Sequence, residues 1–393
     1  MIHYILLGIF LLFITISLYI KIKFKFWSYQ PVFHFYNLLY WIHPPGIINE
    51  YLPEFNKFTN LQNVKTQSIM DIKKHELKQA IQFIKQHYLQ TGNIQFNPTY
   101  KYFMSYFNSQ LNPSYISFYT EPQILIDYKN NDSIQDTKTL GVITSRPLYI
   151  THHSKTFMIS YVDYLCIHNE KRKKGIAPEL IQTHIYNQSK ANKVFDIYFF
   201  KREAKFTGVV PFVAYKTYGF ELEDANRIGD QTLVFNQYHL IEITKKNIRF
   251  FLDFMKKQKK TIILPCLSNI YELIQSNTVT LYAFLKKDVV QCLFMFQNTH
   301  TLYNESRSIS LNGSLVIPNI SNTIFLKGFA LAYKKAMQKY KGTFLFIEDI
   351  SDSDIIIENI QNMIKPFMVS PTAYFFYNYA TRTIESKELF IMC

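Results

Sequence analysis

Residues 157–187 decide the fold of this chain and read FMISYVDYLCIHNEKRKKGIAPELIQTHIYN. The first part, residues 157–167, is rich in β-branched and aromatic side chains and therefore predicts a strand. A basic loop follows at residues 169–174, and Pro178 then opens a helical pattern. The apolar face of that helix comprises Leu180, Ile181 and Ile185. A strand that leads through a basic loop into a helix N-terminus outlines an anion site, because the first backbone N–H groups of a helix are free to bind phosphate.

The loop itself has the form Arg172-x-x-Gly175-x-Ala177, with Lys173 and Lys174 adding positive charge. Small residues allow a close approach of the backbone to a phosphate. This pattern resembles the pyrophosphate-binding loop of acyl-CoA transferases with the GNAT fold. Six residues also fit a plainer interpretation, a helix start with a solvated basic loop.

Three further segments resemble signatures of the N-myristoyltransferase family, which belongs to the GNAT superfamily. Residues 161–168, YVDYLCIH, resemble E-[IV]-N-F-L-C-x-H-K, and residues 26–32, FWSYQPV, resemble F-W-x-T-Q-P-V. Near the end of the chain, Tyr377-Asn378-Tyr379 resembles Y-N-W. The resemblance extends over residues 25–393.

This resemblance implies an α+β fold of two GNAT-like lobes related by a pseudo-two-fold repeat. Residues 25–225 would form the acyl-CoA-binding lobe, and residues 226–393 would contribute the peptide site and the terminal carboxylate. The second half contains no R-x-x-G-x-A loop, so a single acyl-CoA site is expected.

The activity implied by the resemblance is transfer of a long-chain acyl group, myristoyl, from acyl-CoA to the N-terminal glycine of a protein. Myristoyl-CoA would be a co-substrate, with no prosthetic group. The family uses two successive main-chain amides as oxyanion donors, and these correspond to Tyr164 and Leu165. Its base is the terminal carboxylate, here that of Cys393, although residues 386–393 also fit an ordinary edge strand.

The acyl-CoA contacts of the family correspond to residues from three segments of this chain. Gly175 stands where the family has an arginine, so one phosphate contact is expected to be lost, and Phe26 and Trp27 also suit core packing. The full set comprises Lys25, Phe26, Trp27, Tyr164, Leu165, Cys166, Ile167, Arg172, Lys173, Lys174, Gly175, Ile176 and Ala177.

The segments that would recognise the acceptor depart from the family pattern. Asp163 replaces the signature asparagine, and its carboxylate is expected to bind the substrate ammonium group. The family's Y-T-A-G strand reads YFFK at residues 198–201, and its glycine-rich loop reads PFMVSPT at residues 366–372. The family's acidic loop reads QTGNIQ at residues 90–95, so little dependence on a lysine in the acceptor is expected.

Two alternatives to this function stay open from the sequence. In one, a GNAT-type acyltransferase keeps the acyl-CoA site but acylates a lysine side chain or a small amine. In the other, a catalytically dead module binds acyl-CoA without turnover. Acyl-chain-length selectivity and profiling of acceptor peptides distinguish the first alternative from transfer to an N-terminal glycine. Binding of acyl-CoA without turnover identifies the second alternative.

Composition narrows the class of protein further. The chain has 393 residues, of which 48% are hydrophobic, so two lobes with a substantial core are feasible. The formal net charge is +14, but the lysines are dispersed and no nucleic-acid recognition motif is present. We therefore expect a membrane surface and a phosphorylated co-substrate as partners, no nucleic acid, and a monomer.

Four separated cysteines favour a reducing compartment. The His152-His153 pair has no spaced third ligand, so no metal is expected.

The N-terminal segment, residues 4–20, reads YILLGIFLLFITISLYI and carries no charge. We expect residues 1–24 to form a transmembrane anchor, although a buried core helix has the same composition. Lys21, Lys23 and Lys25 follow directly, which places the catalytic body on the cytosolic side by the positive-inside rule.

The remaining chain divides into elements by periodicity and by turn residues. Residues 33–53 are expected to be extended with turns, and residues 129–138 are expected to form a turn. Residues 221–231 are expected to be the lobe boundary, and the acidic run at residues 348–354 is expected to be a solvated helix cap. Helices are expected at residues 71–89, 97–107, 244–256 and 322–340, strands at 116–127, 140–150, 195–200 and 343–347, and a hairpin at 278–286 and 289–297.

Overall fold

The predicted strand at residues 157–167 is part of β6 (Lys155–Ile167), which lies between β5 and β7 in one large mixed sheet of the computed structural model of the chain. The structure describes residues 1–90, 92–127, 132–152, 155–193, 196–203, 207–222 and 237–393. Within these ranges the large sheet has 15 strands and runs in the order β17-β10-β5-β6-β7-β15-β8-β14-β13-β12-β11-β9, with β2, β3 and β4 paired off this path.

The first half of the chain holds the N-terminal helix and the β6 region. Its elements are α1 (Ile2–Lys23), η1 (Trp27–Tyr29), α2 (Leu38–Ile42), β1 (Gly46–Ile47), β2 (Val64–Ser68), α3 (Lys74–His87), β3 (Ile94–Phe96), α4 (Tyr100–Ser105), β4 (Tyr115–Asp127), β5 (Asp132–His152), β6, η2 (Asn169–Lys171), α5 (Ile176–Ala191), β7 (Tyr198–Glu203) and β8 (Val213–Glu221).

The second half completes the sheet and ends on it. Its elements are β9 (Tyr238–Glu242), α6 (Arg249–Lys256), β10 (Thr261–Leu264), α7 (Leu267–Gln275), β11 (Val279–Lys286), β12 (Val289–Tyr303), β13 (Ser306–Val316), α8 (Asn322–Tyr340), β14 (Phe344–Glu348), α9 (Asp354–Gln361), β15 (Met368–Tyr377), β16 (Tyr379–Ala380), η4 (Ser386–Glu388) and β17 (Leu389–Ile391).

The two halves repeat one connection. In the first, the antiparallel strands β4, β5 and β6 lead through α5 to β7, which lies parallel to β6. In the second, the antiparallel strands β11, β12 and β13 lead through α8 to β14, which lies parallel to β13. A parallel neighbour requires such a crossover, and a helix covers the sheet as it returns. The predicted α+β fold with two related lobes is therefore confirmed.

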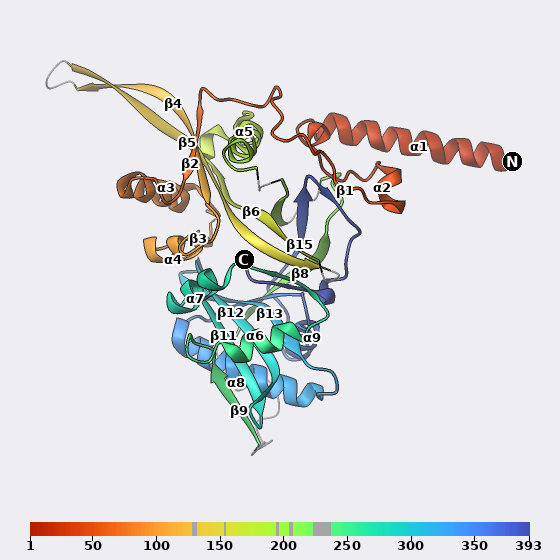
Figure 1. The fold of residues 1–393 in the computed structure, drawn as a ribbon, viewed down its shortest axis with the longest axis vertical. Helices are drawn as coiled ribbons and strands as arrows, with labels where there is room; N and C mark the ends of the chain where they lie inside the picture. Colours follow the sequence, from red (N-terminus) through yellow and green to blue (C-terminus); the bar gives the residue numbers. More distant parts are fainter. Residues whose placement is uncertain (91, 128–131, 153–154, 194–195, 204–206, 223–236) are drawn as a thin grey trace.

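The C-terminal strands join the lobes. β15 pairs with β7 on one side and β8 on the other, and β17 pairs in parallel with β10. Figure 1 shows the chain end in the middle of the molecule, between the lobes. The predicted boundary between residues 225 and 226 lies outside the described residues, as does most of the 221–231 segment.

Most predicted elements are present with shifted ends, and three predictions are wrong. Residues 132–138 continue β5 instead of forming a turn, while residues 128–131 lie outside the described residues. The segment at 33–53, expected to be extended, contains the short helix α2. Glu348, expected to be solvated, is buried with only 6% of its surface exposed.

The N-terminal helix α1 projects away from the body, as Figure 1 shows. It is long and apolar enough to cross a membrane, and none of its residues is buried in the protein. A helix of this length rises about 33 Å, which matches the ~30 Å hydrocarbon core of a bilayer. Its exposed position argues against the alternative of a buried core helix.

Candidate functional site

The site forms where β6 and β7 separate. The two strands pair over only three residues, from Ser160 opposite Tyr198 to Val162 opposite Phe200. Beyond this point their backbones diverge, and the next residues of both strands line one cavity. A gap between two parallel strands exposes backbone groups that the sheet no longer pairs.

An irregularity on the other edge of β6 accompanies the separation. Val142 of β5 lies opposite Cys166, but Thr144 lies opposite Asp163, so two residues of β6 face one residue of β5. The extra residues are Tyr164 and Leu165, and Tyr164 has a φ of 47°. Such a bulge turns successive backbone groups away from the ladder. The two amides predicted as oxyanion donors therefore lie at an interruption of regular pairing.

The Tyr164 amide has a partner in this structure. Its N–H donates a hydrogen bond of 2.8 Å to Oδ1 of Asp163. An oxyanion would have to displace this carboxylate or share the amide with it, and a carboxylate repels a developing negative charge. Burial raises the pKa of Asp163, while Arg146 and the Tyr164 N–H oppose the shift. Protonation of Asp163 would remove the repulsion.

The cavity between β6 and β7 has a volume of about 980 Å³, enough for a large organic ligand. Its lining combines apolar and aromatic side chains with charged ones. Its lining comprises Ile22, Lys23, Phe24, Lys25, Phe26, Trp27, Tyr88, Leu89, Tyr161, Val162, Asp163, Tyr164, Leu165, Ala177, Pro178, Ile181, Ile185, Tyr198, Phe200, Lys201, Arg202, Glu203 and Tyr377. We refer to it as the acyl cavity.

Aromatic packing holds the N-terminal segment against this cavity. The Trp27 ring stacks on Phe200 of β7 with centroids 5.4 Å apart, and Phe26 contacts Trp27 and Phe58 edge to face. The predicted residues Lys25, Phe26 and Trp27 thus line the same cavity as Tyr164 and Leu165. Both interpretations of Phe26 and Trp27, core packing and cavity wall, hold together.

A second cavity of about 460 Å³ adjoins the first at the start of α5, and Leu165, Ala177 and Pro178 line both. Gly175 precedes the helix with a φ of +86°, a conformation that favours glycine. The full lining comprises His87, Tyr88, Leu89, Leu165, Cys166, Ile167, Lys171, Arg172, Lys173, Gly175, Ile176, Ala177 and Pro178. We refer to it as the loop cavity. Lys174 is exposed on the same loop but lines neither cavity.

Arg172 is held in place at the loop cavity. Its Nη2 donates a 2.6 Å hydrogen bond to the carbonyl oxygen of His87, and its Nε donates a 3.4 Å bond to that of Ile167. These carbonyl bonds order the guanidinium and leave its positive charge available to an anion. Burial raises the pKa of the neighbouring Cys166 thiol to about 12, although Arg172 opposes the shift. The thiol therefore stays protonated at neutral pH and is no nucleophile.

The chain end lies near residues that line the acyl cavity. Residues 389–392 are buried, and the Met392 N–H donates to the Ile263 carbonyl oxygen at 2.9 Å. Cys393 follows, with its Sγ 3.3 Å from the hydroxyl of Tyr374. Cys393 also acts electrostatically on Tyr161, a lining residue of the acyl cavity. The structure thus brings the predicted base close to the cavity, although Cys393 itself is not in the lining.

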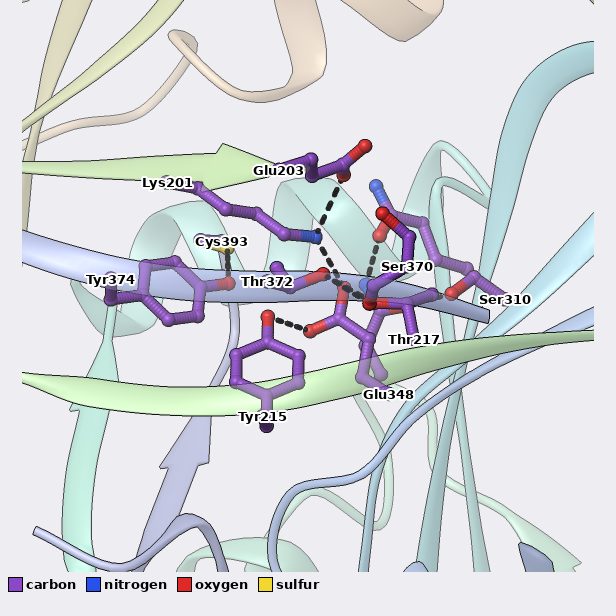
Figure 2. Close-up of polar contacts among 12 residues, drawn as sticks. Lys201, Glu203, Tyr215, Thr217, Ser310, Glu348, Ser370, Thr372, Tyr374 and Cys393 are labelled. Atoms are coloured by element: carbon purple, nitrogen blue, oxygen red, sulfur yellow. Dashed lines mark hydrogen bonds and ion pairs between the residues drawn. The ribbon is translucent and has the colours of Figure 1, made fainter. Parts of the chain in front are cut away.

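An ion pair beside the chain end, between the partly buried Lys201 and the buried Glu348, was missed from the sequence. Lys201 Nζ lies 2.6 Å from Glu348 Oε1 and 3.6 Å from Glu203 Oε1, and Tyr215 donates to Glu348 at 2.7 Å. Figure 2 shows Lys201 reaching between the two carboxylates, next to Cys393. Burial lowers the pKa of Lys201, but Glu348, Tyr215 and Glu203 outweigh it and hold that pKa well above its ordinary value. Lys201 is therefore a fixed cation.

A fully buried cation, Arg146 on β5, was also missed. Only 1% of its surface is exposed, and its guanidinium lies 4.6 Å from the Tyr106 ring centroid and 5.1 Å from that of Tyr161. None of its three side-chain nitrogens has a hydrogen-bond partner within the described ranges. Its charge opposes the rise in pKa that burial causes at Asp163 and at the Cys393 thiol. Arg146 is the one charged residue in the predicted strand at residues 140–150, and this was the available signal.

The described part of the chain contains no group of three His, Cys, Asp or Glu side chains that could hold a metal ion. His152 has a 2.7 Å hydrogen-bond contact with Thr261, and its sequence neighbour His153 lies outside the described residues.

Comparisons with known proteins converge on one family. Residues 55–203 match the family model described as Myristoyl-CoA:protein N-myristoyltransferase, N-terminal domain. A search of curated proteins finds no match.

Similar solved structures include Saccharomyces cerevisiae N-myristoyltransferase with bound myristoyl-CoA. One such structure has 12% sequence identity and a TM-score of 0.69, covering 93% of this chain and 90% of that one. A second has 13% identity and a TM-score of 0.65, with coverage of 92% and 94%. A third, with myristoyl-CoA and inhibitors, has 14% identity and a TM-score of 0.67, with coverage of 92% and 91%. At these identities the likeness establishes the fold.

The pKa of Asp163 yields a testable pH dependence. Because the folded-state pKa is raised, the fold favours the protonated acid, and wild-type stability is lost as pH rises through that pKa. The side-chain amide that Asp163→Asn introduces does not titrate, and its oxygen can still accept from the Tyr164 N–H. We expect the melting temperature of Asp163→Asn, relative to wild type, to rise as the pH increases above the unfolded carboxyl pKa of ~3.9.

Thermal melts at several pH values check this expectation. Asp71→Asn, at an exposed position, is the matched control and is expected to show no such trend. A difference between Asp163→Asn and wild type that stays constant or reverses with rising pH would contradict the argument.

Proposed function

We propose that this chain, which belongs to the N-myristoyltransferase family, transfers a myristoyl group from myristoyl-CoA to the N-terminal glycine of a protein. The single observation that carries the proposal is that the two cavities adjoin and share part of their lining. The loop cavity has a helix N-terminus with Arg172 and Lys173, and it shares Leu165 with the larger, partly apolar acyl cavity. Phosphates at one end and an acyl chain at the other match this distribution of charge and apolar surface.

The arrangement supports the chemistry of amide formation. The substrate amine must lose a proton to attack the thioester carbonyl, and the resulting oxyanion needs preorganised donors. We assign the donors to the Tyr164 and Leu165 amides at the bulge. We assign proton removal to the main-chain carboxylate of Cys393. A free terminal carboxyl group has a pKa of ~3.5, so its carboxylate is a weak base in water. Burial would raise this pKa and make the carboxylate a stronger base. Asp163, in the acyl cavity, would receive the ammonium group of the acceptor.

One observation favours a second candidate. The Asp163 carboxylate accepts the hydrogen bond of the Tyr164 N–H, so this N–H is not free for an oxyanion. This arrangement suits a module that binds acyl-CoA without turnover. Incubation with myristoyl-CoA and a library of N-terminal glycine peptides, followed by mass spectrometry, separates the candidates. Acylated glycine supports the transferase. Stoichiometric acyl-CoA binding with no product from glycine, lysine or small-amine acceptors supports the module.

The same family role fits a membrane-anchored enzyme with its catalytic body facing the cytosol. This proposal is supported by α1, which is apolar and exposed, and by Lys21 and Lys23 in its last turn. The end of α1 and the residue after it contribute Ile22, Lys23 and Phe24 to the acyl cavity, so the anchor and the site are physically continuous. We propose a monomer, since one chain supplies every residue of the site described above.

The loop cavity generates a charge-reversal prediction. Arg172→Glu is expected to weaken CoA binding about 10- to 100-fold, because a charge-assisted hydrogen bond is worth ~1.5–3 kcal/mol. Lys174→Glu reverses the same charge on the same loop outside the cavity lining and should change affinity by less than about threefold. Calorimetry with CoA measures both. Equal effects of the two substitutions would assign the loss to general electrostatics and remove Arg172 from the site.

The chain end generates a second prediction. One added residue after Cys393 would move the carboxylate by about 3.3 Å, beyond the ~2.6–3.2 Å needed for proton transfer. We expect kcat to fall about 10²- to 10⁴-fold with acyl-CoA affinity retained. Cys393→Ala keeps the carboxylate and should retain most of the activity. Normal turnover by the extended protein would transfer the role of base to a side chain, with Asp163 tested first.

Carbonate extraction tests whether α1 spans a bilayer. Full-length protein is expected to stay with membranes after alkaline carbonate extraction, because α1 buries its apolar surface in the hydrocarbon core. Ile9→Lys with Leu12→Lys, at exposed positions in the middle of α1, places charges at the bilayer centre and should release the protein. Release of the unmodified chain by carbonate would contradict a spanning helix.

A further inference from the structure

The short helix α2 and the segment before it expose several large apolar side chains. Phe35, Leu38, Leu39, Trp41 and Ile42 are all exposed, Leu39 by 75% and Ile42 by 61%. Contiguous exposed apolar surface of this kind marks an interaction site in a soluble domain. We refer to these five residues as the α2 surface.

The fold holds the α2 surface in place. The Trp41 ring packs edge to face on Phe33 with centroids 5.1 Å apart, and its indole N–H donates to the Phe35 carbonyl oxygen at 3.0 Å. Phe35 N–H donates to the Gly208 carbonyl oxygen at 2.9 Å, and Val210 N–H donates to that of Phe33 at 2.7 Å. The exposure of these apolar groups is therefore maintained by the tertiary structure.

The α2 surface is attached at the same point as the end of α1. Ile20 packs so closely on Gly208 that a Cβ there would lie 2.4 Å from the Ile20 Cγ2. Lys21 Nζ lies 5.1 Å from the ring centroid of Tyr36, which directly follows Phe35. Figure 1 shows α1 and α2 leaving the body on the same side. The surface therefore adjoins the position where the anchor meets the folded domain.

We propose that the α2 surface inserts into the interfacial region of the bilayer that α1 spans. This inference rests on the anchor proposed above and goes beyond it. A bilayer is the occupant that the anchor itself brings to this face. Leu and Ile side chains suit the acyl-chain boundary, tryptophan is enriched at the headgroup level, and Lys21 and Lys23 suit the headgroups.

A second contact with the bilayer has a consequence for the site. One spanning helix leaves the body free to rotate and tilt about its connection, and a second apolar contact restricts both. Because Ile22, Lys23 and Phe24 line the acyl cavity, this restriction keeps that cavity next to the membrane surface. An acyl donor or an acylated product would then exchange directly with the lipid phase.

The chain carries its own probe for this proposal, because Trp27 and Trp41 are its two tryptophans. Full-length Trp27→Phe protein is reconstituted in phosphatidylcholine vesicles with brominated acyl chains, which quench nearby tryptophan. We expect Trp41 to lose roughly half of its emission or more, as for an indole at the interface. Trp41→Phe protein, which retains Trp27 stacked on Phe200, is the matched control and should be quenched less.

A charged variant tests the contact independently. Leu39→Glu with Ile42→Glu, combined with Trp27→Phe, changes only exposed side chains of α2 and should reduce the quenching of Trp41 to the control level. Carbonate extraction is performed on the same vesicles. Protein retained after extraction with Trp41 quenched no more than the control would overturn the α2 contact alone. Protein released by carbonate would overturn the anchor and, with it, this contact.

Discussion

The separation of β6 and β7 after three paired residues is the constraint on which the site depends. Tyr164 and Leu165 form a bulge against β5, and this irregularity accompanies the divergence of β6 from β7. Two parallel strands that part in this way leave a cavity whose walls are their own backbones. The acyl cavity, the displaced amides and the entry to α5 all follow from this local loss of pairing.

Charge is concentrated where the strands part. Arg146 and Glu348 are buried, and Lys201 and Asp163 lie partly buried nearby. Burying charges is expensive, and such groups persist where opposite charges or aromatic faces compensate them. The Lys201–Glu348 pair is compensated directly, whereas Arg146 relies on two tyrosine rings and on the more distant field of Asp163. This arrangement surrounds the chain end with charges that an incoming amine would meet before reaction.

The N-terminal helix α1 and the folded body are joined without a flexible spacer. The last residues of α1 line the acyl cavity, and the aromatic segment that packs on β7 follows at once. A soluble domain tethered through a long linker would separate localisation from catalysis. In this chain the helix, the cavity wall and the α2 surface share one region, so the position of the protein at a bilayer and the accessibility of its cavity would be coupled.

The sequence by itself determined the strand, loop and helix at residues 157–187, the cluster of candidate cofactor-binding residues around them and the apolar N-terminal helix. These features depend on local periodicity, on Gly175 and on charge, which residues near in sequence encode together. Only the tertiary structure decided that Asp163 occupies the Tyr164 amide, that Lys201 meets Glu348 across 147 residues and that Arg146 is buried between Tyr106 and Tyr161. The second contact joins strands that are distant in sequence and lie in the same sheet, the third forms where β5 pairs with β6, and the first arises where β6 bulges against β5. The acidic run at 348–354 therefore looked solvated in sequence, although β14 carries Glu348 into the interior, where a lysine from another lobe compensates its charge.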